Sequence, residues 1–354
     1  MSADVRGIPP AARGLDELRD RVRSTLGGLL GAAGECGLVD FPRHLNVGDQ
    51  AIWLGERAAL DALGVRVAAA CDRTNYGSAF RRALGDAPVC IHGGGNFGDL
   101  YPTHHALREQ VLRDLPDRRV IQLAQSINFG SAEGLERTRR LISEHGRVTL
   151  LVRDDESERF AREHFEADVV ACPDMAFALP PLRRTAPPVA PVVRQARRDK
   201  ESAGDSAPEG TFDWLEPPTG ARARRTLALR RADLALSTGR RESARRAPRL
   251  LAASPTGAYD RFARWSVGRG LGLLCRGEVV ITDRLHGHIL CTLAAIPHVV
   301  LGDRHGKIRA FWDTWSAGLG TARWAQDAGE ATRLADDLAG RDRVSGAARP
   351  WQAA

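Results

Sequence analysis

The chain has few cysteines, almost no lysine and no long apolar run, and each shortage excludes a class of protein. No apolar run approaches the roughly 20 residues that a membrane-spanning helix needs. The six cysteines form no CxxC pair, which is typical of buried thiols in a reduced protein and not of a disulfide framework or a zinc site. They are scattered over the chain at positions 36, 71, 90, 172, 275 and 291.

A secretory signal is also missing, because charged residues recur between 16 and 23 before any apolar stretch. The sequence therefore predicts a cytoplasmic protein. Its 354 residues are too many for one ordinary core and predict two domains. A content of 43% hydrophobic and 27% charged residues is that of a globular protein.

The formal net charge of +7 is concentrated in one segment. Residues 183–250 contain 16 Lys and Arg against eight Asp and Glu, and the only lysines of the chain are Lys200 and Lys307. Aromatic residues do not alternate with these cations as they do in proteins that bind single strands, so we predict no nucleic-acid partner. A basic face for an anionic small molecule or lipid head group, at the inner surface of a membrane, fits better.

Strand-like and helix-like segments alternate through the first half, which predicts a parallel, doubly wound α/β sheet. A helix over 50–63 is expected to have Asp49 as its N-cap. The expected strands are 36–41, 65–70, 89–92, 119–124, 147–152 and 168–171, and the other expected helices are 104–115 and 132–145.

Prolines 180, 181, 187, 188 and 191 mark an interdomain linker. Beyond them we expect a loop over 199–222 and a basic helical segment over 222–249. The remaining expectations are strands over 189–193, 279–282 and 299–301, and helices over 261–275 and 307–315.

The stretch over 279–298 reads VVITDRLHGHILCTLAAIPH and combines a buried strand, a charged turn and a helix. The carboxyl ends of the strands are where an open α/β sheet binds its ligand. Arg284 offers a guanidinium for a phosphate or carboxylate, and His286 and His288 can transfer protons near neutral pH. The plainer interpretation is an Asp283 N-cap with a surface arginine and two exposed histidines.

Glycine-rich turns follow two strands of the first half. Asn46-Val47-Gly48-Asp49 precedes a helix, and Gly93, Gly94 and Gly95 precede Asn96 and Asp99. Three glycines in succession lower the stability of the chain and indicate that a substrate, or another part of the protein, approaches the backbone closely. A tight structural turn is the alternative.

These residues, in this order, resemble the polysaccharide pyruvyl transferase family. The landmarks are residues 46–49, 92–99, 125–126, 152–154, 173–174 and 282–286. The resemblance implies two Rossmann-like domains in a GT-B-like arrangement: an acceptor-binding domain over 1–180 and a phosphoenolpyruvate-binding domain over 181–354, with a basic insertion at about 195–250. It implies transfer of the enolpyruvyl group of phosphoenolpyruvate to a sugar as a ketal, with release of phosphate. The basic insertion, which departs from the family pattern, suggests a lipid-linked oligosaccharide as the acceptor.

The resemblance also implies residue roles. Arg284 and Arg194 would bind the donor's anionic groups, with Arg197 or Arg198 as alternatives to Arg194, and His286 would be the general acid. Asp99 or Asp49 would be the base. Phosphoenolpyruvate would be a co-substrate, and we expect no cofactor and no metal. The other expected substrate contacts are Leu285, Asn46, Gly93, Gly94, Gly95, Asn96, Arg153, His288 and Lys307.

Two other functions stay open at this point. A nucleotide-sugar-dependent glycosyltransferase would share the two-domain architecture, since a fold does not determine a function. That interpretation needs a ribose-binding carboxylate after a strand of the second domain, and no segment offers a convincing one. A non-catalytic binder of anionic saccharides or lipids would use the basic insertion and would not need His286.

Overall fold

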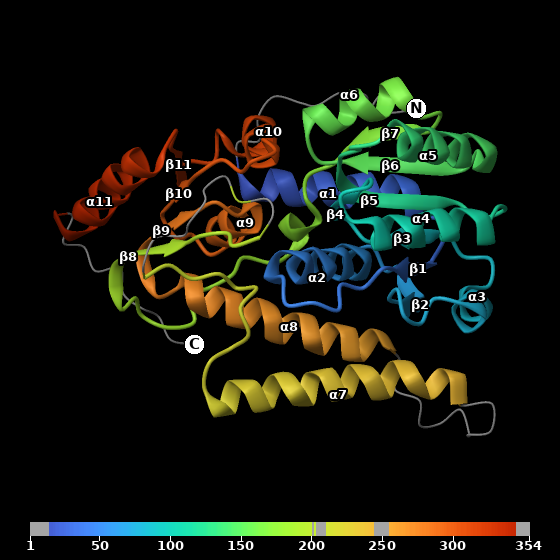
Figure 1. The fold of residues 1–354 in the computed structure, drawn as a ribbon, viewed down its shortest axis with the longest axis horizontal. Helices are drawn as coiled ribbons and strands as arrows, with labels where there is room; N and C mark the ends of the chain where they lie inside the picture. Colours follow the sequence, from blue (N-terminus) through green and yellow to red (C-terminus); the bar gives the residue numbers. More distant parts are fainter. Residues whose placement is uncertain (1–13, 200–201, 203–209, 244–254, 345–354) are drawn as a thin grey trace. The chain divides into compact units, whose positions relative to one another are not determined.

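The computed structural model describes residues 14–199, 202, 210–243 and 255–344 (Figure 1). They form two compact units. The first comprises residues up to Pro180 together with Trp214–Arg269 and Ala310–Leu319, and the second comprises Pro181–Asp213, Gly270–Arg309 and the segment from Gly320 onward. The sequence prediction divided the chain once, after residue 180. The structure instead returns part of the predicted basic insertion to the first unit.

Aromatic packing explains this return. Tyr259 and Phe262 belong to the same buried cluster as Phe41 and Trp53 of the first half. The rings of Phe41 and Tyr259 stack with their centroids 4.1 Å apart, and Trp53 donates a hydrogen bond of 2.9 Å to Asp260. Large buried aromatic side chains dominate the energetics of a core, so the helix that carries them packs with the first sheet.

The first unit is built on a parallel sheet whose strand order is β2-β1-β3-β5-β6-β7, with the short strand β4 paired to β5. The prediction of an α/β fold with parallel strands is confirmed. The turn predicted after β3 differs, because part of it forms β4. The strands are β1 (Glu35–Val39), β2 (Arg66–Cys71), β3 (Val89–Ile91), β4 (Gly94–Phe97), β5 (Val120–Ile127), β6 (Val148–Val152) and β7 (Asp168–Ala171).

Two apolar clusters cover the two faces of this sheet. In β1, Leu38 belongs to one cluster and the next residue, Val39, to the other, as expected of a strand buried on both faces. The first cluster includes side chains of α1 (Leu15–Leu30), α2 (Val47–Ala62), α7 (Ala221–Ser243) and α8 (Pro255–Leu274). The second includes side chains of α3 (Ser78–Leu84), α4 (Pro102–Asp114), α5 (Ala132–His145) and α6 (Asp155–His164).

The second unit has a smaller parallel sheet of order β11-β10-β9-β8, in which α11 (Ala328–Val344) packs on β9 and β10. Its strands are β8 (Ala190–Gln195), β9 (Gly277–Thr282), β10 (His298–Val300) and β11 (Ala322–Trp324). The helix α9 (Leu285–Leu293) follows β9, and α10 (Lys307–Phe311) follows β10. The sequence analysis did not predict β11 or α3.

The strand order defines where ligands are expected in the first unit. After β1 the chain forms β2 on one side of β1 and then returns to form β3 on the other side, so the strand order reverses at β1 and β3. Open α/β sheets bind ligands outside the carboxyl ends of the strands at such a switch point. Asp40 follows β1 directly and His92 follows β3. In the part of the chain described, no helix is long and apolar enough to cross a membrane.

Candidate active site

In the second unit, Arg284 lies at the carboxyl end of β9 and is held by carboxylates. Its Nε and Nη2 atoms donate hydrogen bonds of 2.9 and 2.7 Å to the two oxygens of Asp213, which is itself buried. Nη2 also donates to Asp199 at 2.8 Å. Burial alone would raise the pKa of Asp199, but Arg197 and Arg284 together lower it to about 2. Arg284 is therefore the centre of a charged cluster, and not the exposed residue of the plainer interpretation.

His286 lies in the first turn of α9, which begins directly after Arg284, and is 9% exposed. Gly287 allows this turn to pack tightly on the strands. A β-carbon at position 287 would lie 2.2 Å from side-chain oxygens of both Gln195 and Thr282. Arg284 and His286 are thereby fixed at the same edge of the second sheet, as the sequence predicted.

His288 is placed differently from the prediction. It is 0% exposed, and its Nδ1 lies 2.7 Å from Nε2 of His298, whose own Nδ1 lies 2.8 Å from the carbonyl oxygen of Ile296. Burial and the neighbouring imidazole lower the pKa of His288. His288 is a structural residue inside the second unit, because helical periodicity turns it inward, two residues after His286.

The remaining predicted cations of the second unit lie around this edge. Arg194 is partly buried near the end of β8, in register with Ile281 of β9. Arg197, one of the alternatives to Arg194, pairs with Asp199 at 2.9 Å, and its backbone N–H donates to Asp283. Asp283 thus fixes the loop at Arg197 and is not the helix cap of the plainer interpretation. Lys307 begins α10.

In the first unit, the turn after β1 positions two of the predicted residues. The N-cap of α2 is Asn46, whose side chain accepts a hydrogen bond from the backbone of Gly48, so the prediction that Asp49 is the cap was wrong. Asp49 lies in the first helical turn, where it accepts a hydrogen bond of 2.9 Å from Asn46. His44 lies 3.5 Å from the same carboxylate.

The three consecutive glycines are explained by the protein itself. A β-carbon on Gly93 would lie 2.7 Å from the carbonyl oxygen of Ala124, and one on Gly95 would lie 3.1 Å from the guanidinium of Arg153. Gly94 has a φ of +121°, a conformation that favours glycine. The nearby Asn96 accepts hydrogen bonds from neighbouring side chains. The close approach predicted for a substrate is made by β5 and Arg153.

Arg153 is 4% exposed and makes an ion pair of 2.5 Å with Asp174. It also donates to Ser126, which donates in turn to Asp154. Three of the sequence landmarks, at the ends of β5, β6 and β7, therefore meet in one buried polar network. Buried charges of this kind require such partners. We assign Arg153 a structural role in place of the predicted substrate contact.

Asp99 also differs from its predicted role as the base. Its two oxygens accept hydrogen bonds of 2.6 and 2.7 Å from the backbone N–H groups of Gly130 and Ser131, in the turn before α5. Burial is the largest single influence and raises the pKa of Asp99, but the hydrogen bonds from Gly130 and Ser131 together outweigh it and lower the pKa overall. A carboxylate stabilised in its charged form is a weaker base.

A histidine that the sequence analysis did not select lies against a buried carboxylate at the switch point. Nδ1 of His104, on α4, lies 2.9 and 2.8 Å from the two oxygens of Asp40. Asp40 is 1% exposed and has a φ of 75°, an unusual conformation for a residue other than glycine. A carboxylate that holds one imidazole nitrogen fixes the orientation of the ring and leaves the other nitrogen for a substrate.

The Asp40–His104 pair borders an open pocket of the first unit. The pocket has a volume of about 180 Å³ and is lined by polar groups from the ends of β1 and β2. Its lining residues are Phe41, Arg43, His44, Asp72, Arg73, Thr74 and His104. Close by, His92 pairs with the buried Glu56 at 2.9 Å. No cluster of His, Cys, Asp and Glu among the residues described could hold a metal ion.

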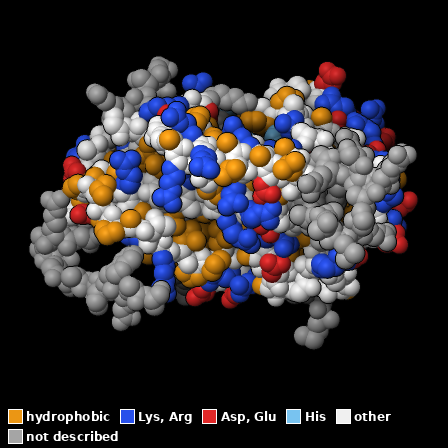
Figure 2. Space-filling model, turned by 90° about the horizontal axis from the view of Figure 1, so that it is seen from below, with side chains coloured by type: hydrophobic (Ala, Val, Ile, Leu, Met, Phe, Trp, Pro, Cys, Tyr) orange, Lys and Arg blue, Asp and Glu red, His pale blue; other side chains and the backbone are white. Residues whose placement is uncertain are grey.

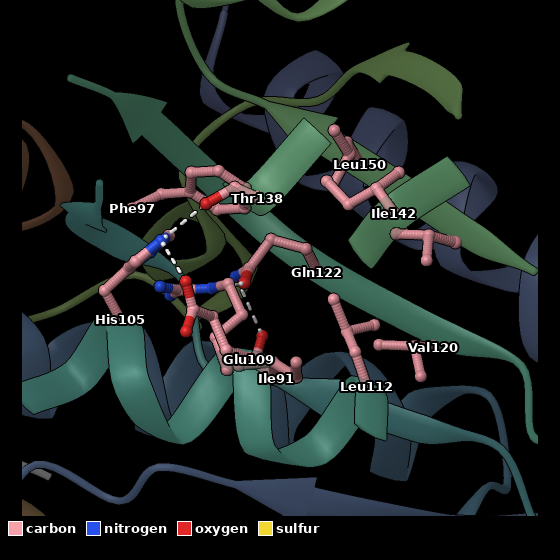
Figure 3. A pocket seen from close by; sticks show the side chains of 12 residues that line it. Ile91, Phe97, His105, Glu109, Leu112, Val120, Gln122, Thr138, Ile142 and Leu150 are labelled. Carbon is pink, nitrogen blue, oxygen red and sulfur yellow. Dashed lines mark hydrogen bonds and ion pairs between the residues drawn. The ribbon is translucent and has the colours of Figure 1, made fainter. Parts of the chain in front are cut away.

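His105, next to His104, also lies near a carboxylate, with its Nε2 3.5 Å from Glu109, but it is buried in the core (Figure 3). Its Nε2 lies 2.8 Å from Oγ1 of Thr138, and its Nδ1 accepts a hydrogen bond from the backbone of Gly98. The cavity beside it measures about 10 Å³, at the lower limit for one water molecule. Burial, with Arg108 nearby, lowers the pKa of His105 to about 4. His105 is a neutral core residue.

Because His105 and His298 are buried as neutral imidazoles, we expect the folded protein to be less stable in acid. Burial also lowers the pKa of His298 to about 4. Because the folded-state pKa of His105 and His298 lies below the unfolded value, their stabilising contribution is complete above about pH 6.5 and is lost as the pH falls toward about 4. We expect each to reduce the free energy of unfolding by about 2 kcal/mol between pH 7 and pH 5. Urea unfolding at both pH values measures this loss, and it should be smaller in His105→Gln. An equal loss in that variant would contradict the assignment.

The class of fold is supported by a solved structure. The chain resembles a functionally uncharacterised protein from Klebsiella pneumoniae with a TM-score of 0.58, over 86% of this chain and 99% of that one. The two sequences are 15% identical, so this similarity concerns the fold alone. It agrees with an α/β architecture of parallel sheets.

Sequence comparison supplies the family. Residues 46–305 match the family model of polysaccharide pyruvyl transferases, and this chain belongs to that family. It is 34% identical over 310 residues to "Pyruvyl transferase 1" of Schizosaccharomyces pombe, covering 79% of this chain and 69% of that protein. It is 29% identical to "Putative pyruvyl transferase EpsO" of Bacillus subtilis, covering 83% of this chain and 89% of the other. The protein is a pyruvyl transferase, as the sequence landmarks predicted.

Proposed function

We propose that the protein transfers the enolpyruvyl group of phosphoenolpyruvate to two hydroxyls of a sugar residue, forming a cyclic ketal and releasing phosphate. The acceptor is a sugar or a lipid-linked oligosaccharide. The observation that carries the proposal is that Arg284 and His286 lie at the same edge of the second sheet, in a chain that belongs to the pyruvyl transferase family. The GT-B-like arrangement of the two units stays a prediction.

The second unit supplies the donor chemistry in this proposal. Phosphoenolpyruvate carries a phosphate and a carboxylate, which planar guanidinium groups bind well. Arg284 is rigidly oriented by Asp213, and Asp199 occupies part of its remaining hydrogen-bonding capacity. We expect the donor to take the place of Asp199. Arg194 is the proposed second cation, and His286 the proton donor to the enol carbon.

The first unit supplies the acceptor chemistry. We assign the base to His104, oriented by Asp40, in place of Asp99. The pocket beside the pair is below the roughly 300–1,000 Å³ of sites for drug-sized ligands, which favours a single sugar ring over a nucleotide. His104 would remove a proton from the attacking hydroxyl, as a positioned imidazole does in general base catalysis.

The proton balance of the reaction closes without a cofactor. Protonation of the enol carbon gives an oxocarbenium-like C2, to which the first hydroxyl oxygen bonds. Phosphate then leaves with the electron pair of its C2–O bond, and the second hydroxyl oxygen bonds to the oxocarbenium-like C2 that results. The two hydroxyls lose two protons in these steps. One proton replaces that given to the methyl group, and the other is carried away by phosphate. The reaction therefore needs one acid and one base, the roles proposed for His286 and His104.

Calorimetric titration with phosphoenolpyruvate tests the donor assignment. We expect binding to weaken at least tenfold in Arg284→Lys, because an ammonium group cannot reproduce the bidentate geometry. Binding should strengthen in Asp199→Asn, which removes a competing negative charge from Arg284. Arg284→Ala is less suitable, because it leaves the buried Asp213 unpaired, at a cost of about 3–5 kcal/mol of stability.

The same titration with UDP and UDP-sugars separates the alternatives. Arg140→Gln, an exposed arginine on α5, is the matched control for the loss of one positive charge and should bind as wild type does. Binding of a UDP-sugar without binding of phosphoenolpyruvate would support the glycosyltransferase instead. Phosphoenolpyruvate binding that is unaffected by Arg284→Lys would refute the donor site.

A further inference from the structure

The helix α7 presents an outward face that contacts no other described part of its unit. Leu227 and Leu234 are buried against α8, and Asp233 on the flank of the helix pairs with Arg261 of α8 at 2.9 Å. On the opposite side, Leu229 and Leu236 are 62% and 59% exposed. They are seven residues apart, which is two helical turns, so they lie on one line along the helix.

Small and basic side chains surround these leucines. Ala228, Ala232 and Ala235 are exposed and widen the apolar line on one side. Figure 2 shows blue Lys and Arg side chains interspersed with orange hydrophobic ones on this face, with few acidic ones. The exposed arginines of α7 are Arg222, Arg224, Arg225 and Arg231, and none of them makes an ion pair with a described residue. Arg222 and Arg225, seven and four residues before Leu229, lie on the same side of the helix as the leucines.

We propose that α7 is a peripheral membrane-binding helix whose outward face contacts anionic phospholipid head groups. A helix that lies at a membrane surface combines a basic polar face with an apolar line that enters the head-group region. The long arginine side chains can place their aliphatic part along the apolar line and their charge at the phosphates. Each such cation near an anionic membrane contributes to binding.

A protein partner fits this face less well. Two leucines and three alanines supply far less apolar contact than the roughly 800 Å² that each partner buries in a stable complex. The excess of arginine would also repel a second copy of the same face, since like charges disfavour such a contact. A membrane needs only the narrow apolar line and the positive charge. Membrane binding by α7 would bring the proposed transferase to lipid-linked acceptors. The membrane proposal is argued from the residues of α7 and does not depend on the proposed reaction.

Co-sedimentation with lipid vesicles tests the proposal on the full chain. We expect binding to vesicles that contain phosphatidylglycerol, none to vesicles of phosphatidylcholine alone, and weaker binding at high salt, because salt screens exposed charges. Arg222→Gln with Arg225→Gln should weaken binding about thirtyfold, as the loss of two surface cations implies. Leu229→Ser with Leu236→Ser should abolish stable binding at unchanged charge.

Matched controls come from other exposed positions. Arg139→Gln with Arg140→Gln removes the same charge from α5, and Val189→Ser removes a side chain that is 75% exposed. Both should bind vesicles as wild type does. Equal losses in these controls, or equal binding to both kinds of vesicle, would overturn the proposal. So would a dimer in size-exclusion chromatography that the leucine substitutions dissociate. Phosphoenolpyruvate binding should be unchanged in all the α7 variants, so failure of the transferase proposal would be seen separately.

Discussion

A His286→Ala variant is expected to bind phosphoenolpyruvate and to lose turnover about 10²–10⁴-fold, the range for removal of a general acid. His286 lies in the first turn of α9, next to the donor-binding Arg284 that we propose. Because Arg284 and its carboxylate partners do not depend on the imidazole, binding and chemistry should separate. Phosphate release from phosphoenolpyruvate with a panel of glycosides measures turnover, and calorimetry measures binding.

His305→Ala is the matched control, since His305 is an exposed histidine of the same unit in the turn after β10. It should retain wild-type turnover and binding. A His286→Ala variant with full turnover would rule out the acid assignment and favour the interpretation as a non-catalytic binder. If that variant loses binding of phosphoenolpyruvate as well as turnover, His286 binds the anionic groups of the donor and does not transfer a proton.

Asp40→Asn is expected to lower kcat about 10²–10³-fold, because the imidazole of His104 would no longer be held in its orientation by a carboxylate. Asparagine tolerates the positive φ of Asp40, so the backbone should be preserved. His104→Ala should show a similar loss, and the double variant should lose little more than either single one, since the two residues act as a unit.

Glu136→Gln, at an exposed carboxylate on α5, controls for the loss of one negative charge and should leave kcat unchanged. Asp99→Asn distinguishes our assignment from the sequence prediction. It should lower the free energy of unfolding, because Asp99 accepts hydrogen bonds from the backbone of Gly130 and Ser131. Activity should then fall only in proportion to the fraction of protein that is folded. A loss of kcat in fully folded Asp99→Asn, together with full activity in Asp40→Asn, would return the base to Asp99.

The sequence determined the class of fold and one edge of the candidate site. Alternating apolar strands and amphipathic helices are local patterns, so the parallel strands of the first half other than β4 were predicted to within a few residues. The run that contains Arg284 and His286 was also readable, because strand, turn and helix are contiguous there. Family membership followed from the order of the landmarks, which needs no knowledge of distances.

Only the tertiary structure decided which polar residues face a pocket. His104 and His105 are neighbours in the sequence, yet one pairs with Asp40 beside an open pocket and the other is sealed among α4, α5 and β4. Asp40 is 64 residues from its partner, and Arg153 is 21 residues from Asp174. Such pairings depend on strand order and on the direction of each side chain, which the composition of a segment does not encode. The aromatic contacts that return α8 to the first unit are of the same long-range kind.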